Sequence, residues 1–380
     1  GKNNMRINKI MALAYAGKTL LWAGSPLMNW ASGGNREYNT ELCKRGAELL
    51  GEALRITEET GRYELAPMDQ YNDIFLLHNS NGRINGVNEA IFQENLIDYD
   101  SRWRWNMVND FRPTSIEASG IKNYPTANYV NYFGMANGYP LPEDITQADA
   151  ESGYDPTHPW KNRDPRFYRT FAFPGVRWAF ANDPRNADNM YPYNGPDYVL
   201  WNYVWYASVE DRDNVESNTN FGPDGLMSNA KGIYVRKRSD DYDVNNSPLY
   251  EWSDDRHFGR SAAPWMELRY TEVKLNLAEA ACGAGHMDEA VEILKEIRRR
   301  VGYTGDCGLD ATLSSDQAAC MSAVLYERQI ELAFEGKRFD DMRRWMLFDG
   351  GTGTVKGAPS TWKLTGWDGN TCTWLGYRAM

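Results

Sequence analysis

Apolar residues recur at helical spacing near the start of the chain. In residues 5–24 they lie three or four positions apart, and Gly24-Ser25-Pro26 ends the pattern. A second helix of similar length is predicted from Tyr38 to Thr60, with Gly61 placed to adopt the left-handed turn that often follows a helix. A short loop joins the two segments, so the sequence predicts a helical hairpin.

The same spacing returns in the last third of the chain. Apolar positions between Met266 and Ala281 predict one helix, and Asp288 is placed to cap a second that runs to Val301. Two further helices are predicted at residues 315–335 and 338–347. These segments form two more hairpins, and helix pairs with a period of about 34 residues are typical of tetratricopeptide-like repeats.

The segment between these helical regions has a different composition. Residues 97–265 are rich in Asn, Asp, Gly, Pro, Trp and Tyr and show little periodicity, with short strands predicted only at 168–173 and 232–238. The predicted fold class is therefore mostly α: helical hairpins that support a large, loop-rich insert with a few short strands. We expect a single domain with four parts, namely residues 1–96, 97–265, 266–349 and 350–380.

Charge and hydropathy exclude several classes of function. The 380-residue chain carries 52 acidic and 41 basic side chains, a net charge of −11, so nucleic acid is not an expected partner. No apolar run reaches the roughly 18 residues of a membrane-spanning helix, and no signal peptide is visible at the start. The chain begins inside an amphipathic helix, so we expect a further segment upstream.

The five cysteines form no metal-binding or redox motif. Cys307 and Cys320 are separated by a short, glycine-rich segment, and the sequence leaves open whether these two thiols pair.

One short acidic run resembles the start of a calcium loop. It consists of Asp241, Asp243 and Asn245, but the sixth and twelfth positions are Asn246 and Trp252, which excludes an EF-hand. The run stays a weak calcium candidate, and no other cofactor is expected.

Three glutamates lie on one face of a predicted helix. Glu327, Glu331 and Glu335 have the i, i+4, i+8 spacing, and paired carboxylates are the acid and base of glycosidases. Like charges at this spacing repel unless they are neutralised, and several arginines lie nearby, between Arg328 and Arg344. The interpretation we favour is a structural Arg–Glu network that ties the last two helices together.

The aromatic residues give the strongest indication of function. The chain has 23 Tyr, 14 Trp and 13 Phe, and 24 of these aromatics lie in residues 99–206. Tyr and Trp rings stack on the apolar faces of sugar rings, while Asn, Asp and Arg bond the hydroxyls. Any single ring is more often a packing residue, but the set as a whole predicts several exposed rings.

Four segments resemble the SusD/RagB-like outer-membrane nutrient-binding lipoproteins of Bacteroidetes. The longest is MELRYTEVKLNLAEAA at 266–281, and the second comprises residues 297–302 with the later run from Glu327 to Trp345. The third pairs MANG at 135–138 with NRDPRF at 162–167. The fourth pairs residues 21–27 with 63–65. They cover nearly the whole chain in the family's order.

The resemblance implies a fold and a role. The fold is four tetratricopeptide-like helix pairs that support a loop-rich binding region. The role is capture of glycan, or in some members of peptide, as a lid on a TonB-dependent (SusC-like) transporter, without catalysis. Membership also implies a lipid-anchored protein on the outer face of the outer membrane, with its lipidated cysteine upstream of this chain.

The resemblance places the binding aromatics ahead of the Asp164-Pro165-Arg166 turn, with further candidates in the loops after it. The candidate ligand-binding residues are Arg102, Trp103, Trp105, Tyr124, Asn128, Tyr129, Tyr132 and Trp160, with Tyr193 and Trp201 as secondary candidates.

Two other classes of function stay open. A glycoside hydrolase would use two carboxylates among the aromatics, from the set Glu143, Asp144, Glu151 and Asp155. A helical-repeat adaptor that binds only protein would leave the Trp and Tyr residues of the insert without a role, although the peptide-binding relatives keep peptide as a possible ligand.

Overall fold

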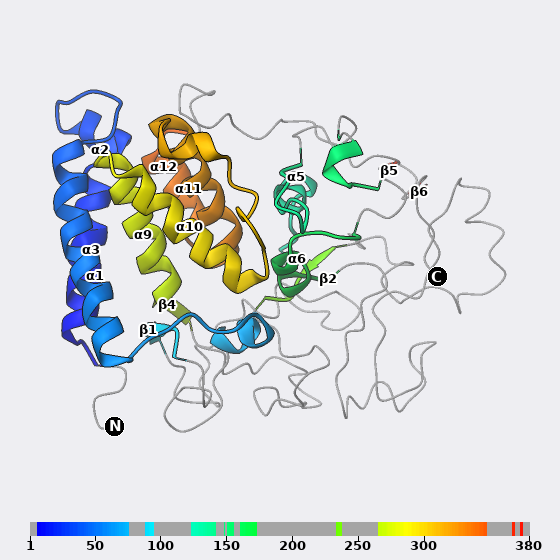
Figure 1. Ribbon diagram of the computed structural model, residues 1–380, viewed down its shortest axis with the longest axis horizontal. Coiled ribbons are helices and arrows are strands. Elements are labelled where there is room, and N and C mark those ends of the chain that lie inside the picture. The colour runs from blue at the N-terminus through cyan, green and yellow to red at the C-terminus, as the bar shows by residue number, and fades with distance from the viewer. Residues whose placement is uncertain are drawn as a thin grey trace. The chain divides into compact units, whose positions relative to one another are not determined.

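The chain folds into two compact units, which are described here one at a time (Figure 1). The computed structural model describes residues 6–75, 88–94, 123–141, 148, 150–155, 160–172, 233–237, 265–347, 367–368 and 373–374. The first, helical unit comprises residues 1–74, 79–94 and 265–358, and the second, loop-rich unit comprises 75–78, 95–264 and 359–380. The four-part division expected from the sequence stays a prediction.

Helices dominate the first unit, as the sequence predicts. Its α-helices are α1 (Lys9–Ala23), α2 (Pro26–Ala31), α3 (Thr40–Thr60), α9 (Tyr270–Gly283), α10 (Met287–Val301), α11 (Gln317–Glu331) and α12 (Arg338–Arg344). Its remaining elements are the 3-10 helices η1 (Met68–Phe75), which runs one residue into the second unit, and η6 (Ala311–Ser314), and the strands β1 (Ala90–Glu94) and β4 (Trp265–Arg269).

The first hairpin forms as its sequence pattern predicts. Asn8 caps α1 by accepting from the Met11 N–H at 3.0 Å, and Asn39 caps α3 by accepting from the Leu42 N–H at 3.1 Å. Gly61 follows α3 with a φ of +56°, in the left-handed region that glycine favours. α1 and α3 pack side by side (Figure 1).

α1 and α3 approach each other closely at Gly17. A Cβ added to Gly17 would lie 2.5 Å from Leu50 Cγ and 3.1 Å from the Gly46 carbonyl oxygen. Leu50 is itself completely buried, so it has no free space into which to move.

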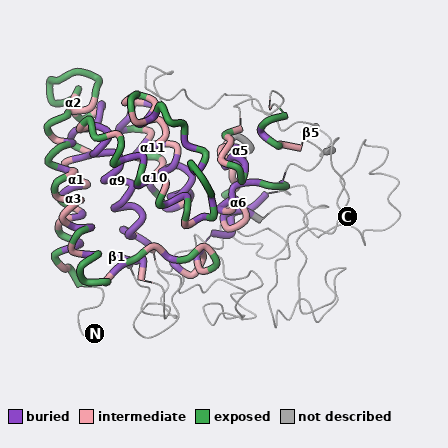
Figure 2. The backbone as a smooth tube through the Cα atoms, viewed as in Figure 1, coloured by how far each residue is buried: buried purple, intermediate pink, exposed green. Residues whose placement is uncertain are grey.

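Helix α9 is the centre of the helical unit. All of its residues are buried, and it packs against α1, α3, α10 and α11 (Figure 2). Apolar side chains such as Val273, Leu277 and Ala281 join the core, while charged residues on the same helix are equally buried. These charges need partners inside the protein.

Two helix starts differ from the sequence prediction. Residues 265–269 form strand β4, which pairs antiparallel with β1, so the helix predicted from Met266 begins only at Tyr270. Short apolar runs do not distinguish a strand from the first turn of a helix. His286, not Asp288, is the residue before α10, and Asp288 lies in its first turn, where its charge favours the helix dipole.

The loop-rich unit contains short elements in its described residues. They are the helices α5 (Ala127–Tyr132) and α6 (Pro165–Thr170), the 3-10 helix η3 (Ala150–Ser152), and the strands β2 (Phe171–Ala172), β3 (Tyr234–Val235), β5 (Trp367–Asp368) and β6 (Thr373–Trp374). Strands β2 and β3 pair, as do β5 and β6. In neither unit's described residues is any helix both long enough and apolar enough to span a membrane.

The strand predicted at 168–173 is wrong for its first half. Residues up to Thr170 belong to α6, and only Phe171 and Ala172 pair with β3. The helix forms because Asp164 caps it and Pro165 occupies its first position, a start signal that outweighs the β-propensity of the aromatic residues. The strand predicted at 232–238 is present as the shorter Tyr234–Val235.

Two glycine substitutions test the close approach of α1 and α3. We expect Gly17→Ala to lower the free energy of unfolding by about 1–3 kcal/mol, because the new methyl overlaps Leu50. Gly51→Ala, in α3, is the control: nothing lies within 4 Å of its added Cβ, and helix propensity is expected to raise stability by about 0.5–1 kcal/mol. Urea unfolding measures both, and equal changes would contradict a tight contact at Gly17.

Candidate ligand-binding site

Helix α5 carries three of the candidate binding residues, at positions 128, 129 and 132. Thr126 caps the helix by accepting from the Tyr129 N–H at 3.3 Å. The half-buried ring of Tyr129 lies edge-on to Tyr132, with 6.4 Å between ring centroids, and edge-on to Phe133 at 6.2 Å. The helix therefore holds two tyrosines together, and each has part of its surface in solvent.

Buried aromatic rings support α5. Phe133 is fully buried and meets Phe171 at 4.9 Å between centroids and Phe167 at 6.4 Å, both edge-on. Edge-to-face contacts of this kind add to the stabilisation from burial alone. The outer tyrosines thus rest on a packed layer.

A buried arginine closes the C-terminal end of α5. Arg163 is 1% exposed, and its guanidinium donates to the carbonyls of Val130 at 3.0 Å and Phe133 at 3.1 Å. It also lies 4.7 Å from the centroid of the Phe167 ring. The last carbonyls of a helix have no intrahelical partner, and here a side chain about thirty residues later in the chain satisfies them.

The next residues of the NRDPRF segment have structural roles as well. Asp164 caps α6 by accepting from the Arg166 N–H at 2.8 Å, and its other carboxylate oxygen accepts from the Arg166 guanidinium at 2.8 Å. Both side chains are buried. In the sequence this segment indicated only the family, although Asp followed by Pro is also a recognised signal for the start of a helix.

Tyr124 and Trp160 differ in how much ring they leave exposed. Tyr124 is half-buried and packs edge-on against Tyr234 at 5.6 Å. Trp160 is only 6% exposed, stacks on Phe167 at 6.0 Å, and its carbonyl accepts from the Tyr168 hydroxyl at 2.6 Å. This packing leaves little of the Trp160 ring for a ligand, so Tyr124, Tyr129 and Tyr132 are the better supported candidates.

The other candidates lie outside the described residues. These are Arg102, Trp103, Trp105, Tyr193 and Trp201, together with the calcium candidates Asp241, Asp243 and Asn245. The residues that the structure does describe contain no group of His, Cys, Asp or Glu arranged to hold a metal ion.

Of the four carboxylates considered for a glycoside hydrolase, two lie in the described residues and two lie outside them. Glu143 and Asp144 lie outside the described residues, Glu151 is exposed, and Asp155 is half-buried.

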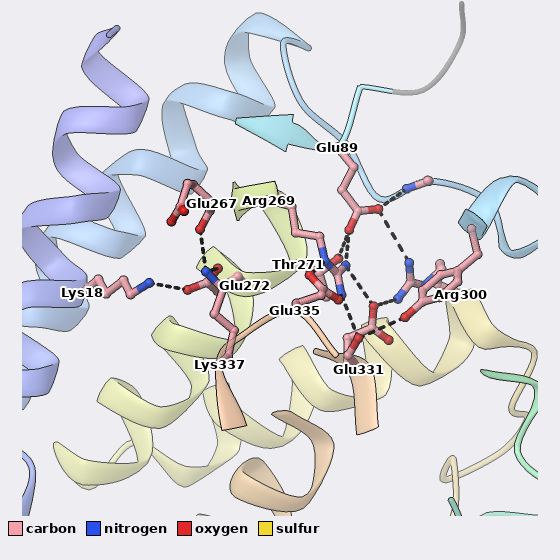
Figure 3. Close-up of polar contacts among 12 residues, drawn as sticks. Lys18, Glu89, Glu267, Arg269, Thr271, Glu272, Arg300, Glu331, Glu335 and Lys337 are labelled. Atoms are coloured by element: carbon pink, nitrogen blue, oxygen red, sulfur yellow. Dashed lines mark hydrogen bonds and ion pairs between the residues drawn. The ribbon is translucent and has the colours of Figure 1, made fainter. Parts of the chain in front are cut away.

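The glutamate face of α11 forms a buried ion network in the helical unit (Figure 3). Arg269, fully buried at the end of β4, donates to Glu331 at 3.0 Å and to Glu335 at 2.8 Å, and it also pairs with Glu89. Arg300, which lies on α10, pairs with Glu331 and with Glu89. Neutralisation of the glutamates by arginine is thus confirmed. The arginines come from β4 and α10 and not from the expected run between Arg328 and Arg344, so these ion pairs connect the glutamates to β4 and α10. The sequence did not identify Glu89 or Arg269 as members.

Glu327 has its own arginine. Its carboxylate accepts from Arg298 at 2.8 Å, and both side chains are buried. All three glutamates are therefore buried and paired with arginines. A catalytic acid and base must contact the sugar, so these glutamates do not suit a glycoside hydrolase.

A second group of buried charges surrounds Glu272 on α9. Lys18 donates to its carboxylate at 2.7 Å, and Lys337 lies 3.4 Å away. Burial alone would raise the pKa of Glu272, but these two lysines outweigh it and hold the pKa below its usual value.

A third group joins α9 to α12. Glu279 pairs with Arg344 and accepts from the Trp345 indole at 2.9 Å, and Arg328 links Asn276 to Asp341. Burial would raise the pKa of Asp341, but the two arginines lower it well below its usual range.

Comparison with known proteins identifies the family. A profile of the SusD family matches residues 88–369, which is well over half of the chain. The chain belongs to the SusD family. The resemblance found in the sequence motifs is thereby confirmed.

Solved structures show the same fold. A SusD-like protein from Bacteroides fragilis aligns with a TM-score of 0.58 at 22% identity, covering 91% of this chain and 56% of that one. A SusD-like carbohydrate-binding protein from the same species aligns at 0.55 and 20% identity, covering 100% and 62%. A SusD superfamily protein from Parabacteroides distasonis aligns at 0.50 and 16% identity, covering 89% and 52%.

These relatives are longer than the present chain. The chain spans roughly half to two thirds of each of the three aligned structures. A search of curated proteins gives no match.

The Glu272 ion pair predicts a pH dependence. Because its folded-state pKa lies below the unfolded value of about 4.3–4.5, the pair stabilises the protein above that pH, and this contribution is lost as the pH falls through the folded-state pKa. We expect Glu272→Gln to lower the free energy of unfolding by about 3–5 kcal/mol at pH 7. The difference from wild type should narrow below about pH 4.5.

Chemical unfolding at several pH values measures this difference. Glu48→Gln is the control, because Glu48 is an exposed carboxylate on α3. A difference between wild type and Glu272→Gln that stays constant from pH 7 to pH 4 would contradict the assignment.

Proposed function

We propose that the protein binds an oligosaccharide or polysaccharide, without catalysis, through aromatic residues of the loop-rich unit. The observation that carries the proposal is membership of the SusD family over residues 88–369, since that match includes the whole described aromatic cluster. A relative of the same fold is described as a SusD-like carbohydrate-binding protein, which supports the choice of ligand class.

The chemistry of the α5 tyrosines fits a sugar. A tyrosine offers an apolar ring face for the C–H groups of a pyranose and a hydroxyl for its polar edge. Tyr129 and Tyr132 are half-buried on a rigid support, so binding would cost little side-chain ordering. The proposal also includes Tyr124, Asn128 and Trp160, together with the candidates outside the described residues, which are Arg102, Trp103, Trp105, Tyr193 and Trp201.

Absence of catalysis is part of the proposal. Glu327, Glu331 and Glu335, which are the carboxylates with the most regular spacing, are buried against arginines. Incubation with a panel of glycans tests the point: no new reducing ends are expected, and their appearance would favour the hydrolase alternative. Binding is expected to need no cofactor, and EDTA treatment tests the calcium candidates Asp241, Asp243 and Asn245.

Location and partner follow from the same family role. We propose a lipid-anchored protein on the outer face of the outer membrane that delivers glycan to a SusC-like, TonB-dependent transporter. An exposed apolar patch in the helical unit supports a protein partner: Met28 and Trp30 on α2 are 46% and 48% exposed, and Phe339 on α12 is 61% exposed. The helices α2 and α12, which carry these side chains, contact each other.

A tyrosine double variant tests the binding site. We expect Tyr129→Ala with Tyr132→Ala to weaken affinity about ten- to thousandfold, by analogy with bases stacked on aromatic rings. Calorimetry would use the glycan that binds best on an array. The control is Tyr15→Ala, a half-buried tyrosine on α1 that packs against Phe92.

The melting temperature of each variant separates loss of binding from loss of folding. Unchanged affinity in a folded double variant would contradict the site. The pair Trp103→Ala with Trp105→Ala extends the same assay. If peptides bind and glycans do not, the ligand class is wrong while the site can still be correct.

The apolar patch gives a test of the partner. In detergent extracts of the native membrane we expect the protein to co-purify with a TonB-dependent transporter. Trp30→Ala with Phe339→Ala should reduce recovery of that transporter, while Ile7→Ala, which changes an exposed side chain before α1, should not. A protein that is always recovered alone would contradict the proposed complex.

A further inference from the structure

Three cysteines gather in the core of the helical unit. Cys43 on α3 is 2% exposed, and Cys282 on α9 and Cys320 on α11 are 0% exposed. Each of the three is a free thiol in the structure. All three belong to the same hydrophobic cluster.

Cys282 and Cys320 are direct neighbours. Each thiol is the largest influence on the pKa of the other, which is raised at Cys282 and lowered at Cys320, so the two side chains face each other. The first turn of α11 is fixed against Cys282 by Gln317, whose side-chain amide donates to the Cys282 carbonyl at 2.7 Å, while the Cys282 thiol lies 3.5 Å from the Gln317 carbonyl. Cys320 is one helical turn after Gln317, so its side chain is on the same side of α11 as that contact.

Cys43 lies beside the residue that follows Cys282. Its sulfur would be 2.7 Å from a Cβ added to Gly283, so it rests against the backbone of α9 where glycine leaves room. Burial, followed by the nearby Glu279 carboxylate, raises the pKa of the Cys43 thiol to about 12. A thiol in this environment is a poor nucleophile.

Cys307 is not part of this cluster. Its sulfur contacts the carbonyl oxygens of Lys295 and Gly305, each at 3.8 Å, in a small apolar cluster with Val301 and Tyr303. The sequence left open whether Cys307 and Cys320 pair. In the structure both are free thiols, and they belong to different apolar clusters, with Cys320 in the cluster of Cys282.

We propose that Cys282 and Cys320 form an internal disulfide when the chain folds in the presence of a small-molecule or protein disulfide. One cysteine attacks the oxidant as its thiolate and forms a mixed disulfide with loss of one thiol. The second cysteine then displaces the other thiol. Two thiol protons and two electrons pass from the pair to the oxidant, whose disulfide is reduced to two thiols.

The bond would link the central helix to α11 at the end opposite their ion network. Cys282 is in the last turn of α9 and Cys320 is near the start of α11, whereas Arg269 and Glu331 pair just before α9 begins and where α11 ends. Because both sulfurs are fully buried, we expect the bond to form while the chain folds and then to resist reduction until the protein unfolds.

Disulfide mapping on the full chain tests the proposal. The reduced, unfolded chain is refolded in glutathione buffer containing oxidised glutathione, its free thiols are alkylated after denaturation, and its peptides are analysed by mass spectrometry. We expect a peptide pair linked through Cys282 and Cys320, with three of the five cysteines alkylated. Alkylation of both Cys282 and Cys320, or a link from either to Cys43 or Cys307, would overturn the proposal.

Variants and stability supply an independent readout. Cys307→Ser should keep the linked pair, and Cys320→Ala should lose it and leave Cys282 alkylated. Oxidised wild type should melt about 4–10 °C above the reduced protein, because the bond closes a loop of nearly forty residues, and Cys320→Ala should show no such difference. If Cys320→Ala does not fold, the disulfide map of the wild type and the difference in melting temperature between its oxidised and reduced forms still test the proposal.

Discussion

A central helix buried on every side determines how the helical unit is built. α9 satisfies its own backbone hydrogen bonds, but each charged side chain it carries must meet an opposite charge inside the protein. Glu272 meets Lys18 from α1, Lys274 meets Glu296 from α10, and Glu279 meets Arg344 from α12. The helices α1, α10 and α12 thus each supply a specific partner, and these pairs help to fix the position of each of the three against α9.

In the loop-rich unit, the groups that need partners are the backbone N–H and carbonyl groups at the helix ends rather than charged side chains. Among its described residues, the α-helices α5 and α6 have six residues each, too few to be stable in isolation. Arg163 satisfies the end of α5, and Asp164 satisfies the start of α6. Two consecutive residues, Arg163 and Asp164, therefore stabilise the two short helices. In this way the loop-rich unit gains a defined surface without long helices or strands.

Much of the helical unit could be predicted from its sequence. Gly61, the spacing of apolar residues and the glutamates of α11 each specify local structure, and α3 ends as predicted. Glu89 could not be identified as a partner of Arg269, because 180 residues separate them and no local pattern connects them. For the same reason the sequence did not reveal that Cys320 lies beside Cys282.

The site was predictable in kind rather than in detail. Composition indicated aromatic stacking, but it does not distinguish a half-buried ring such as Tyr132 from a buried one such as Trp160, because burial depends on contacts that are distant in the sequence. The buried contacts of Arg163 have a wider consequence. Arg163 holds the end of the helix that carries Tyr129 and Tyr132. Substitutions at such buried positions would therefore tilt the two rings without changing either tyrosine. If these rings contact the ligand as proposed, ligand preference can diverge during evolution through buried residues, so two relatives with identical contact residues need not select the same ligand.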